Sequence, residues 1–398
     1  MKNWRKEDIL TKQNQETLTL AEKKKRIQTA VDKINQEAND VVALIADSDT
    51  AKEFMNTEYI PTPSMELNEV ISGQPGTGGF PKGKISIVMG QPDSGKTLSI
   101  LESIGNYMNS AQGAEDTCLW IESERSLEES AFRMFHIPMD RFVVLKTEAN
   151  EGGEAVLDRA EAMLNTGAFN IFVINSLKAL TPKAIMGKPI SEDTIGVHAR
   201  MNSKMCAKFE PLINHYKVAM IIVAHLTTQI GSYGADPLTM SGGQAIRYHS
   251  ALQLDFRKQS IQEADPIKKT EGMKIAVYVR KNHCNQTDFP YGKVVYYVIY
   301  GQGTETKLAL LQKGLDNGTL RKAGAWIYFK ESPEAEEIGW CGKQAFREAL
   351  EDPKLYRKVE RVVGGIQDEL TQEEIEEFVA AEEEDKSAKK KSRKKSDA

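Results

Sequence analysis

Residues 90 to 98 combine glycines, a lysine and a threonine at the spacing of a phosphate-binding loop. Gly90-Gln-Pro-Asp-Ser-Gly95-Lys96-Thr97 fits the pattern G-x-x-x-x-G-K-[ST]. Its glycines let backbone N–H groups point at phosphate oxygens, and the helix that follows adds partial positive charge. Lys96 would reach the β- and γ-phosphates, and Thr97 would offer its hydroxyl to Mg²⁺. An ordinary glycine-rich turn is the alternative. The expected nucleotide-binding residues are Gly90, Gln91, Pro92, Asp93, Ser94, Gly95, Lys96, Thr97 and Leu98.

Two carboxylates follow the next apolar stretch. Thr117-Cys-Leu-Trp-Ile121 has the composition of a buried strand, and Glu122-Ser-Glu124 comes directly after it. A carboxylate at the carboxyl end of a parallel strand, beside a phosphate loop, lies in the crevice where ligands bind. Glu124 would there polarise the water that attacks the γ-phosphate. The alternative is a surface acidic pair that caps the following helix.

These residues need a sheet that places strand ends side by side. Near-continuous apolar stretches alternate with helical ones, which indicates an α/β protein with a mostly parallel sheet covered on both faces. After residue 245 the pattern favours antiparallel strands added to the same sheet. The expected strands are 85–89, 117–121, 142–145, 169–174, 219–224, 251–256, 273–280 and 293–300, and the expected helices are 98–108, 153–165 and 197–215.

Composition places the chain among water-soluble proteins. Hydrophobic residues make up 40% and charged residues 27%, and no apolar run approaches the ~20 residues of a membrane span. The polar N-terminal residues lack the apolar centre of a signal peptide, so we expect a cytoplasmic protein without membrane contact. The four scattered cysteines fit reduced thiols.

We expect four parts along the chain. Residues 1–55 form a helical arm with apolar residues every three or four positions, which packs either on its own domain or on a neighbouring subunit. Residues 56–303 form the core, and residues 304–365 a small α+β module. Residues 366–398 form an acidic and then basic tail, which is either a disordered solubilising segment or a nucleic-acid tether or nuclear-type signal. The net charge of −5 owes its sign to that acidic segment.

Four motifs occur in the order and context seen in bacterial RecA proteins. They are Ile121-Glu-Ser-Glu124, Leu180-Thr-Pro-Lys-Ala184, Gly242-Gly-Gln-Ala245 and Lys322-Ala-Gly-Ala-Trp326. The chain therefore resembles a RecA-family recombinase over about residues 55 to 365. The resemblance implies a RecA-like P-loop ATPase core, with ATP and Mg²⁺ as cofactors.

The resemblance also implies roles for strand-end residues. Asn175 stands where the family has the aspartate that helps to hold Mg²⁺. Because the amide lacks the negative charge, ATP hydrolysis is expected to be slow, and Asn175→Asp is expected to speed it. Glu122 would supply the missing charge. His225 matches the γ-phosphate-sensing position, where phage UvsX-type relatives also carry histidine; a core histidine is the alternative. Lys96, Glu124 and His225 are thus the expected catalytic residues, and Thr97, Asn175 and Glu122 the expected metal-site residues. Ala131, next to Phe132, replaces the tyrosine that stacks on adenine.

Two loops of the family bind DNA, and they resemble residues 185–197 and 226–243 here. Apolar side chains in them wedge between base steps, whereas cations and backbone N–H groups hold the phosphates. The matching positions are Ile195, Arg200, Ile230, Gly242, Gly243 and Gln244.

The family builds its ATP site between subunits. Lys281 and His283 match the basic residues that reach across to the phosphates, with Arg280 as a substitute or a solvated charge. Arg247 and Tyr248 match the positions that couple neighbouring sites.

The resemblance implies an ATP-dependent recombinase that forms homo-oligomeric helical filaments on single-stranded DNA and exchanges strands with homologous duplex DNA, with single-strand-binding and loader proteins as further partners. Asn175, His225 and the divergent N-terminus favour a bacteriophage source. The alternatives are a RecA-like mediator or paralogue with weak hydrolysis, and a hexameric helicase of the same fold.

Overall fold

A computed structural model describes the chain over residues 19–38, 41, 43, 45–49, 56–148, 151–186, 189, 196–228, 238–240, 244–263, 265–285 and 292–365. The chain divides into two compact units, Met1–Thr57 and Glu58–Ala398. In the first unit, helix α1 (Leu20–Ala38) forms where the apolar spacing predicts a helix, and none of its residues is buried. Ile27 and Ile34 on this helix are about half exposed.

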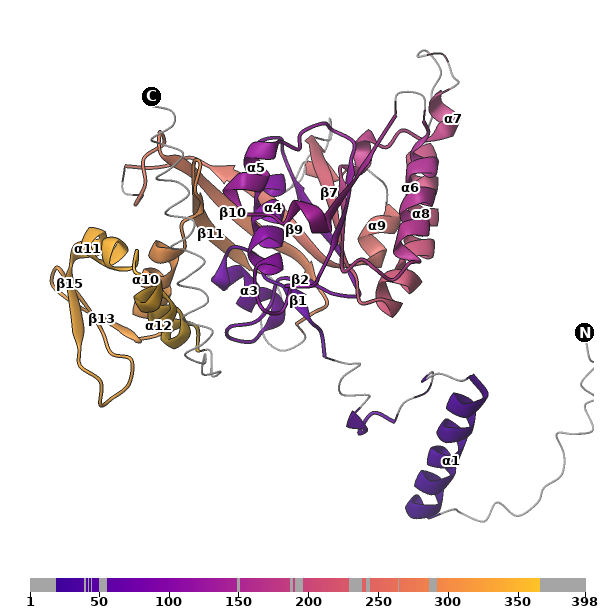
Figure 1. The fold of residues 1–398 in the computed structure, drawn as a ribbon, viewed down its shortest axis with the longest axis horizontal. Coiled ribbons are helices and arrows are strands. Elements are labelled where there is room, and N and C mark those ends of the chain that lie inside the picture. The colour runs from indigo at the N-terminus through magenta and orange to yellow at the C-terminus, as the bar shows by residue number, and fades with distance from the viewer. Residues whose placement is uncertain are drawn as a thin grey trace, which may run out of the picture. The chain divides into compact units, whose positions relative to one another are not determined.

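One large sheet organises the second unit (Figure 1). Its strands follow the order β12-β11-β10-β9-β3-β7-β6-β4-β5, and β8 pairs with β7. The strands from β3 to β5 in that order pair in parallel. Strand β9, which was expected to be an antiparallel addition, also pairs in parallel with β3, so the antiparallel part begins one strand later, at β10. The bounds of these strands are β3 (Ile85–Gly90), β4 (Cys118–Glu122), β5 (Phe142–Lys146), β6 (Ile171–Asn175), β7 (Ala219–Thr228) and β9 (Ser250–Gln259), and those of β8, which pairs antiparallel with β7, are Leu238–Met240.

The remaining strands of this sheet are antiparallel additions at one edge. Strand β10 (Gly272–Asn282) pairs with both β9 and β11 (Lys293–Ile299), and β12 (Gly303–Thr304) pairs with β11. The predicted α/β class with a mostly parallel central sheet is confirmed. A short antiparallel pair, β1 (Tyr59–Ile60) with β2 (Phe80–Pro81), lies outside this sheet.

Helices cover the two faces of the sheet because side chains alternate along each strand. Val88 points into a cluster with Ile100 and Ile104 of α4 (Lys96–Met108). Ile87 points to the opposite face, into a cluster that includes side chains of α6 (Gly153–Leu164) and α8 (Val197–His215). Figure 1 shows α6 and α8 side by side on one side of the sheet and α4 on the other. The further elements here are α3 (Met65–Ser72), α5 (Glu129–Met134), α7 (Lys183–Met186), α9 (Gln244–His249) and the 3₁₀ turns Met139–Arg141 and Leu177–Ala179.

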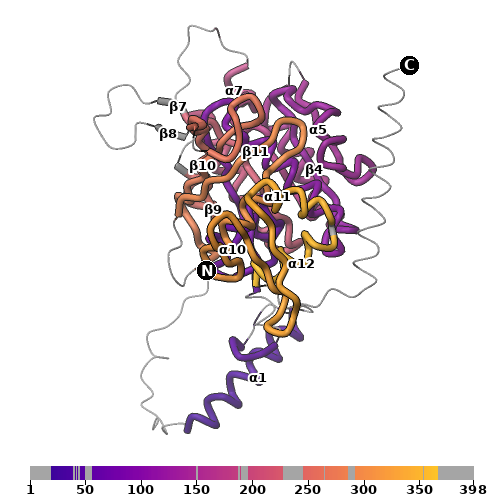
Figure 2. Tube along the Cα trace, turned by 90° about the vertical axis from the view of Figure 1, so that its left-hand side faces the viewer, coloured from indigo at the N-terminus to yellow at the C-terminus, as the bar shows by residue number. Residues whose placement is uncertain are grey.

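A second, smaller sheet follows the large one. Its antiparallel strands are β13 (Leu320–Ala323), β14 (Trp326–Phe329) and β15 (Ile338–Cys341), which pack with α10 (Thr306–Asp316), α11 (Gly342–Ala349) and α12 (Pro353–Gly364) around their own apolar cluster. Helices α10 and α12 lie side by side in both views (Figures 1 and 2). Lys313 of α10 forms an ion pair with Glu69 of α3, which ties this module to the core. The fourfold division of the chain stays a prediction, and its tail lies outside the described residues.

The predicted strands and helices of the core form close to their expected bounds. The helix expected over 98–108 begins two residues earlier, at Lys96, so that Lys96 and Thr97 lie in its first turn. Across the described part of the chain, no helix is long and apolar enough to cross a membrane.

Candidate nucleotide and DNA site

The phosphate loop joins the end of β3 to the start of α4. Gly90 is the last residue of the strand, and Lys96 is the first of the helix. Gly95 precedes the helix with φ of 87°, in the left-handed region where glycine is favoured. Among the residues that the structure describes, no side chain caps this helix N-terminus, so its backbone donors are open to water or a ligand. This geometry suits an anion such as a phosphate group.

Gly90 is needed because the neighbouring strand comes close. A Cβ at this position would lie 2.4 Å from the carbonyl oxygen of Phe256 in β9. Real side chains do not approach a backbone oxygen so closely. The glycine therefore lets β3 and β9 pair directly under the loop.

Lys96 is buried, with 6% of its surface exposed, and its ammonium group lies inside the loop. Its Nζ donates to the carbonyl oxygen of Gln91 at 2.7 Å and to Ser94 Oγ at 3.3 Å. Burial lowers the pKa of Lys96, against the opposing effect of the carboxylates of Glu124 and Asp93. The loop thus holds the cation on its inner side, where phosphate oxygens would replace its loop contacts.

Glu124 lies in a network formed by three strand ends. It follows β4, and its Oε1 accepts a hydrogen bond from the hydroxyl of Ser176, which follows β6. Nε2 of His225 in β7 lies 2.7 Å from the same Oε1. Burial alone would raise the pKa of Glu124, but the contacts with Ser176 and His225 outweigh it and lower that pKa. Glu124 is therefore held as a carboxylate, which can orient a water molecule and accept its proton.

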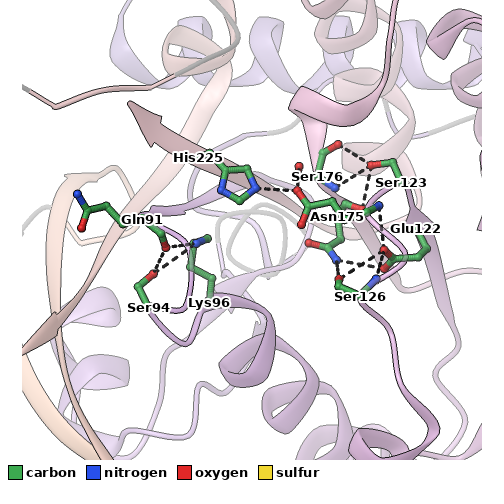
Figure 3. Close-up of polar contacts among 10 residues, drawn as sticks. Gln91, Ser94, Lys96, Glu122, Ser123, Ser126, Asn175, Ser176 and His225 are labelled. Atoms are coloured by element: carbon green, nitrogen blue, oxygen red, sulfur yellow. Dashed lines mark hydrogen bonds and ion pairs between the residues drawn. The ribbon is translucent and has the colours of Figure 1, made fainter. Parts of the chain in front are cut away.

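Strand register explains why His225 reaches this network. In the parallel pairing of β3 with β7, His225 lies beside Gly90, where the phosphate loop begins. The carboxyl ends of β3, β4, β6 and β7 lie at one edge of the sheet, as parallel pairing requires. Figure 3 shows Lys96 and His225 on one side and the side chains around Asn175 on the other, all facing the same region.

Glu122 is a buried carboxylate at the end of β4, with 7% of its surface exposed. Its Oε1 accepts the backbone N–H groups of Glu124 at 3.0 Å and Ser126 at 3.1 Å. Its Oε2 accepts Nε1–H of Trp120 at 2.9 Å and Nδ2–H of Asn175 at 3.1 Å. Both oxygens thus serve the protein's own donors.

Asn175 is fully buried at the end of β6. Its Nδ2 also donates to Ser126 Oγ at 3.1 Å, whereas its Oδ1 has no hydrogen-bond partner among the described residues. A buried carbonyl oxygen without a donor is costly, so it marks a place for a water molecule or a cation. Mg²⁺ prefers oxygen ligands and keeps several waters when it binds with nucleotide phosphates. Asn175 Oδ1 is therefore an oxygen that Mg²⁺ could take as a ligand, and the phosphate loop suits the phosphates of ATP. The metal role of Thr97, which lies in the first turn of α4, stays a prediction.

No larger metal centre accompanies these oxygens: nowhere in the described ranges do three His, Cys, Asp or Glu side chains gather in a group able to hold a metal ion.

Sequence reasoning missed Trp120, Ser126 and Ser176, whose hydrogen bonds hold the site together. Ser126 and Ser176 carried only the signal of following a strand, and Trp120 lies in the middle of β4, where an apolar pattern predicts burial and no site role.

The candidate DNA residues are only partly described. Arg200 is exposed on α8, and Gln244 is the first residue of α9. Ile195, Ile230, Gly242 and Gly243 lie outside the described residues. The assignment of all six to DNA stays a prediction.

Lys281 and His283 do not join the phosphate loop of their own chain. Gly90 pairs with Phe256 of β9, which pairs with Val277 of β10. Lys281 lies four residues farther along β10, on the order of 13 Å at ~3.3 Å per residue, toward the opposite end of the sheet. His283 lies beyond it, where its N–H donates to the Ala251 carbonyl oxygen.

Lys281 instead holds the end of α9. Its Nζ donates to the carbonyl oxygens of Arg247 at 2.8 Å and Tyr248 at 3.0 Å. Burial lowers the pKa of Lys281. The Tyr248 side chain is 77% exposed, so it is open to contact another molecule. Lys281 and the two predicted coupling residues are thus brought together within one chain.

The residues at the position expected to contact adenine, and also Arg280, pack against or pair with other side chains of this chain. Ala131 and Phe132 lie on α5, and the Phe132 ring packs edge-on against Phe142 with ring centres 4.8 Å apart. Arg280 donates to the buried Asp255 carboxylate at 2.7 Å, which also binds Arg257. Arg280 is therefore a paired cation.

Comparison with known proteins gives a consistent family. A family model described as the RecA N-terminal domain matches residues 25–305. Protein RecA of Fusobacterium nucleatum subsp. nucleatum is 30% identical over 313 residues, which cover 78% of this chain and 77% of that protein. Protein RecA of Nocardia farcinica is 28% identical over 324 residues, which cover 81% of this chain and 88% of that protein. With the phosphate loop and strand-end carboxylate in place, this chain belongs to the RecA family.

Proposed function

We propose that this RecA-family recombinase binds and hydrolyses ATP to control its assembly on DNA. The observation that carries the proposal is Glu124, held by Ser176 and His225 at the sheet edge from which the phosphate loop emerges. Bound ATP with Mg²⁺ supplies a γ-phosphoryl group that is transferred to water, giving ADP and phosphate. The phosphate loop, Lys96 and Glu124 lie together at this edge, where they would hold those phosphates and place that water.

Each residue has a defined task in the proposed reaction. The backbone of residues 90–98 cradles the phosphates, and Lys96 stabilises the charge on the β- and γ-phosphate oxygens. Thr97 and Asn175 offer neutral oxygens to Mg²⁺. Glu124 orients the attacking water and accepts its proton, while His225, bonded to Glu124, registers whether the γ-phosphate is present.

The proposed active unit is a helical homo-oligomer on single-stranded DNA that pairs with homologous duplex DNA. Its site is completed by Lys281 and His283 of a neighbouring copy, because their strand register places them away from their own phosphate loop. Arg247 and Tyr248 would couple neighbouring sites. ATP would favour the DNA-binding state because a ligand shifts a conformational equilibrium by its differential affinity.

A mediator with weak hydrolysis is a second candidate, favoured by one observation. Asn175 places a neutral oxygen where the family is expected to have a charged one, and Mg²⁺ is thereby less well neutralised. Such a protein would still bind ATP and DNA. A bacteriophage source and the single-strand-binding and loader partners stay predictions.

Filament formation on single-stranded DNA tests the proposal. The wild type, with a slowly hydrolysed ATP analogue, should give long helical filaments in electron micrographs. Lys96→Ala should abolish them by removing the phosphate-binding cation, whereas Lys330→Ala, at an exposed position in the C-terminal module, should leave them intact. A closed hexamer, or filaments unchanged by Lys96→Ala, would contradict the proposal. Filaments without measurable ATP turnover would favour the mediator.

A further inference from the structure

The amide of Asn175 can face only one way. Its nitrogen lies against two acceptors, Glu122 Oε2 at 3.1 Å and Ser126 Oγ at 3.1 Å. Turning the amide over would place Oδ1 against the Glu122 carboxylate, where two oxygens would meet without a hydrogen atom between them. In Figure 3 the amide oxygen lies on the side of Lys96, and the nitrogen lies on the side of Glu122 and Ser126.

Glu122 is fully engaged in this arrangement. A carboxylate has about four lone-pair positions, and four N–H donors from Trp120, Glu124, Ser126 and Asn175 occupy them. The Ser126 hydroxyl is a further, longer contact, 3.5 Å from Oε1. Two of these donors belong to the turn that carries Glu124, and one belongs to Asn175. A single buried side chain thus connects the residue expected to place the water with the residue expected to face Mg²⁺.

We propose that Glu122 is a positioning residue of the ATP site and acts through Asn175 and the Glu124 turn, without binding the metal itself. This inference rests on the proposed ATPase function. The resemblance implies a negatively charged side chain at position 175. In this chain the negative charge lies instead on Glu122, the side chain that accepts a hydrogen bond from Asn175. Groups in such an outer layer fix the orientation of metal ligands and tune metal affinity.

The hydrogen bond between Asn175 and Glu122 reverses the effect that is expected of Asn175→Asp. The resemblance to the family implies that aspartate at this position would speed ATP turnover. In the structure, an aspartate at 175 would place a second carboxylate beside Glu122, at a distance now bridged by an N–H group. Two carboxylates that share one site repel each other, so the substitution should weaken Mg²⁺ binding.

The test compares the wild type with Glu122→Gln, Asn175→Asp and the double variant. The primary measurement is the Mg²⁺ concentration that gives half-maximal binding of a fluorescent, slowly hydrolysed ATP analogue. Each single change should raise it about ten- to a hundredfold, the usual effect of losing an outer-layer partner. The double variant restores one amide and one carboxylate, so it should need less Mg²⁺ than either single variant.

Glu102→Gln is the matched control. Glu102 of α4 is also a buried carboxylate, 6% exposed, and it accepts the backbone N–H and hydroxyl of Thr304 in β12. Glu102→Gln should lower the thermal unfolding temperature of the nucleotide-free protein without changing the Mg²⁺ midpoint. A structural role for Glu122 would give the same result as this control.

Three outcomes separate the possibilities. Unchanged Mg²⁺ midpoints in Glu122→Gln, with normal binding by the wild type, would overturn the positioning role alone. A lower midpoint in Asn175→Asp that Glu122→Gln does not alter would also overturn it, because the two side chains would be acting independently. Absence of Mg²⁺-dependent binding in the wild type would overturn the proposed function and the inference together.

Discussion

Nε2 of His225 lies 2.7 Å from Oε1 of Glu124, although the two residues come from strands that are separated by β6 in the sheet. Each residue also faces a different part of the site, since His225 lies beside Gly90 in the strand register and Glu124 bonds Ser176. The contact therefore links the start of the phosphate loop to the proposed catalytic carboxylate.

Replacing Glu124 by glutamine should slow ATP hydrolysis and leave ATP binding almost unchanged. Glutamine keeps the shape and hydrogen bonds of the side chain but cannot accept a proton from water, a loss of roughly 10²–10⁴-fold in rate. Steady-state ATPase assays and equilibrium binding of a slowly hydrolysed analogue measure the two effects separately. Equal losses in both would indicate that Glu124 supports the loop and not the reaction.

The His225 contact should depend on hydrogen bonding and not on ring shape. His225→Gln retains a group that can donate to Glu124, so it should keep much of the wild-type coupling between ATP and DNA binding. His225→Ala removes that donor and should reduce the stimulation of ATPase activity by DNA. The measurement is ATPase rate with and without single-stranded DNA, and similar stimulation in the two variants would exclude this role.

Gly90→Ala should destabilise the core and weaken nucleotide binding. The added methyl group would meet the Phe256 carbonyl oxygen at 2.4 Å, so β3 and β9 would have to separate under the loop. Overpacking of this kind costs about 1–3 kcal/mol. Thermal unfolding of the nucleotide-free protein measures the loss, and an unchanged midpoint would show that the strands accommodate the methyl group.

Acid should remove a stabilising contribution of Asp265. The pKa of Asp265 is lowered to about 2. The largest cause is the hydrogen bond from the Lys274 ammonium, and the next is the hydrogen bond from the backbone N–H of Gln262. The folded pKa lies below the unfolded value of about 3.9, so the contribution is present above that value and is lost as the pH falls through about 2. The stability difference between the wild type and Asp265→Asn should therefore be largest near neutral pH and shrink between pH 4 and 2 in urea unfolding. A difference in stability that stays constant over this pH range would contradict the prediction.

Mixing two inactive variants should restore activity if the ATP site lies between subunits. Lys96→Ala lacks the phosphate-loop cation, and Lys281→Ala lacks the cation proposed to reach in from the neighbour. In a 1:1 mixture that assembles head to tail at random, about a quarter of the contacts combine an intact Lys96 with an intact Lys281. ATPase activity of the mixture should exceed that of either variant, and a rate equal to their average would place Lys281 outside the neighbour's site.

Local patterns were sufficient to predict the sheet, the phosphate loop and the carboxylate after β4. Apolar runs, glycine spacing and the lysine at position 96 are short-range features, because each depends only on residues that are close together in the sequence. Family resemblance added His225, Asn175 and Lys281 as positions of interest. Neither could show which atoms meet, because the hydrogen bonds from Asn175 to Glu122 and between His225 and Glu124 join residues that are 53 and 101 positions apart.

Only the tertiary structure decided which groups Glu122, Asn175 and Lys281 contact. Parallel pairing brings Glu122 and Asn175 into register, so the carboxylate binds the amide and fixes which atom faces the phosphate loop. The antiparallel pairing of β9 and β10 carries Lys281 toward the other end of the sheet, away from its own loop. The sequence determined which chemical groups the site contains, and strand register determined their directions and partners.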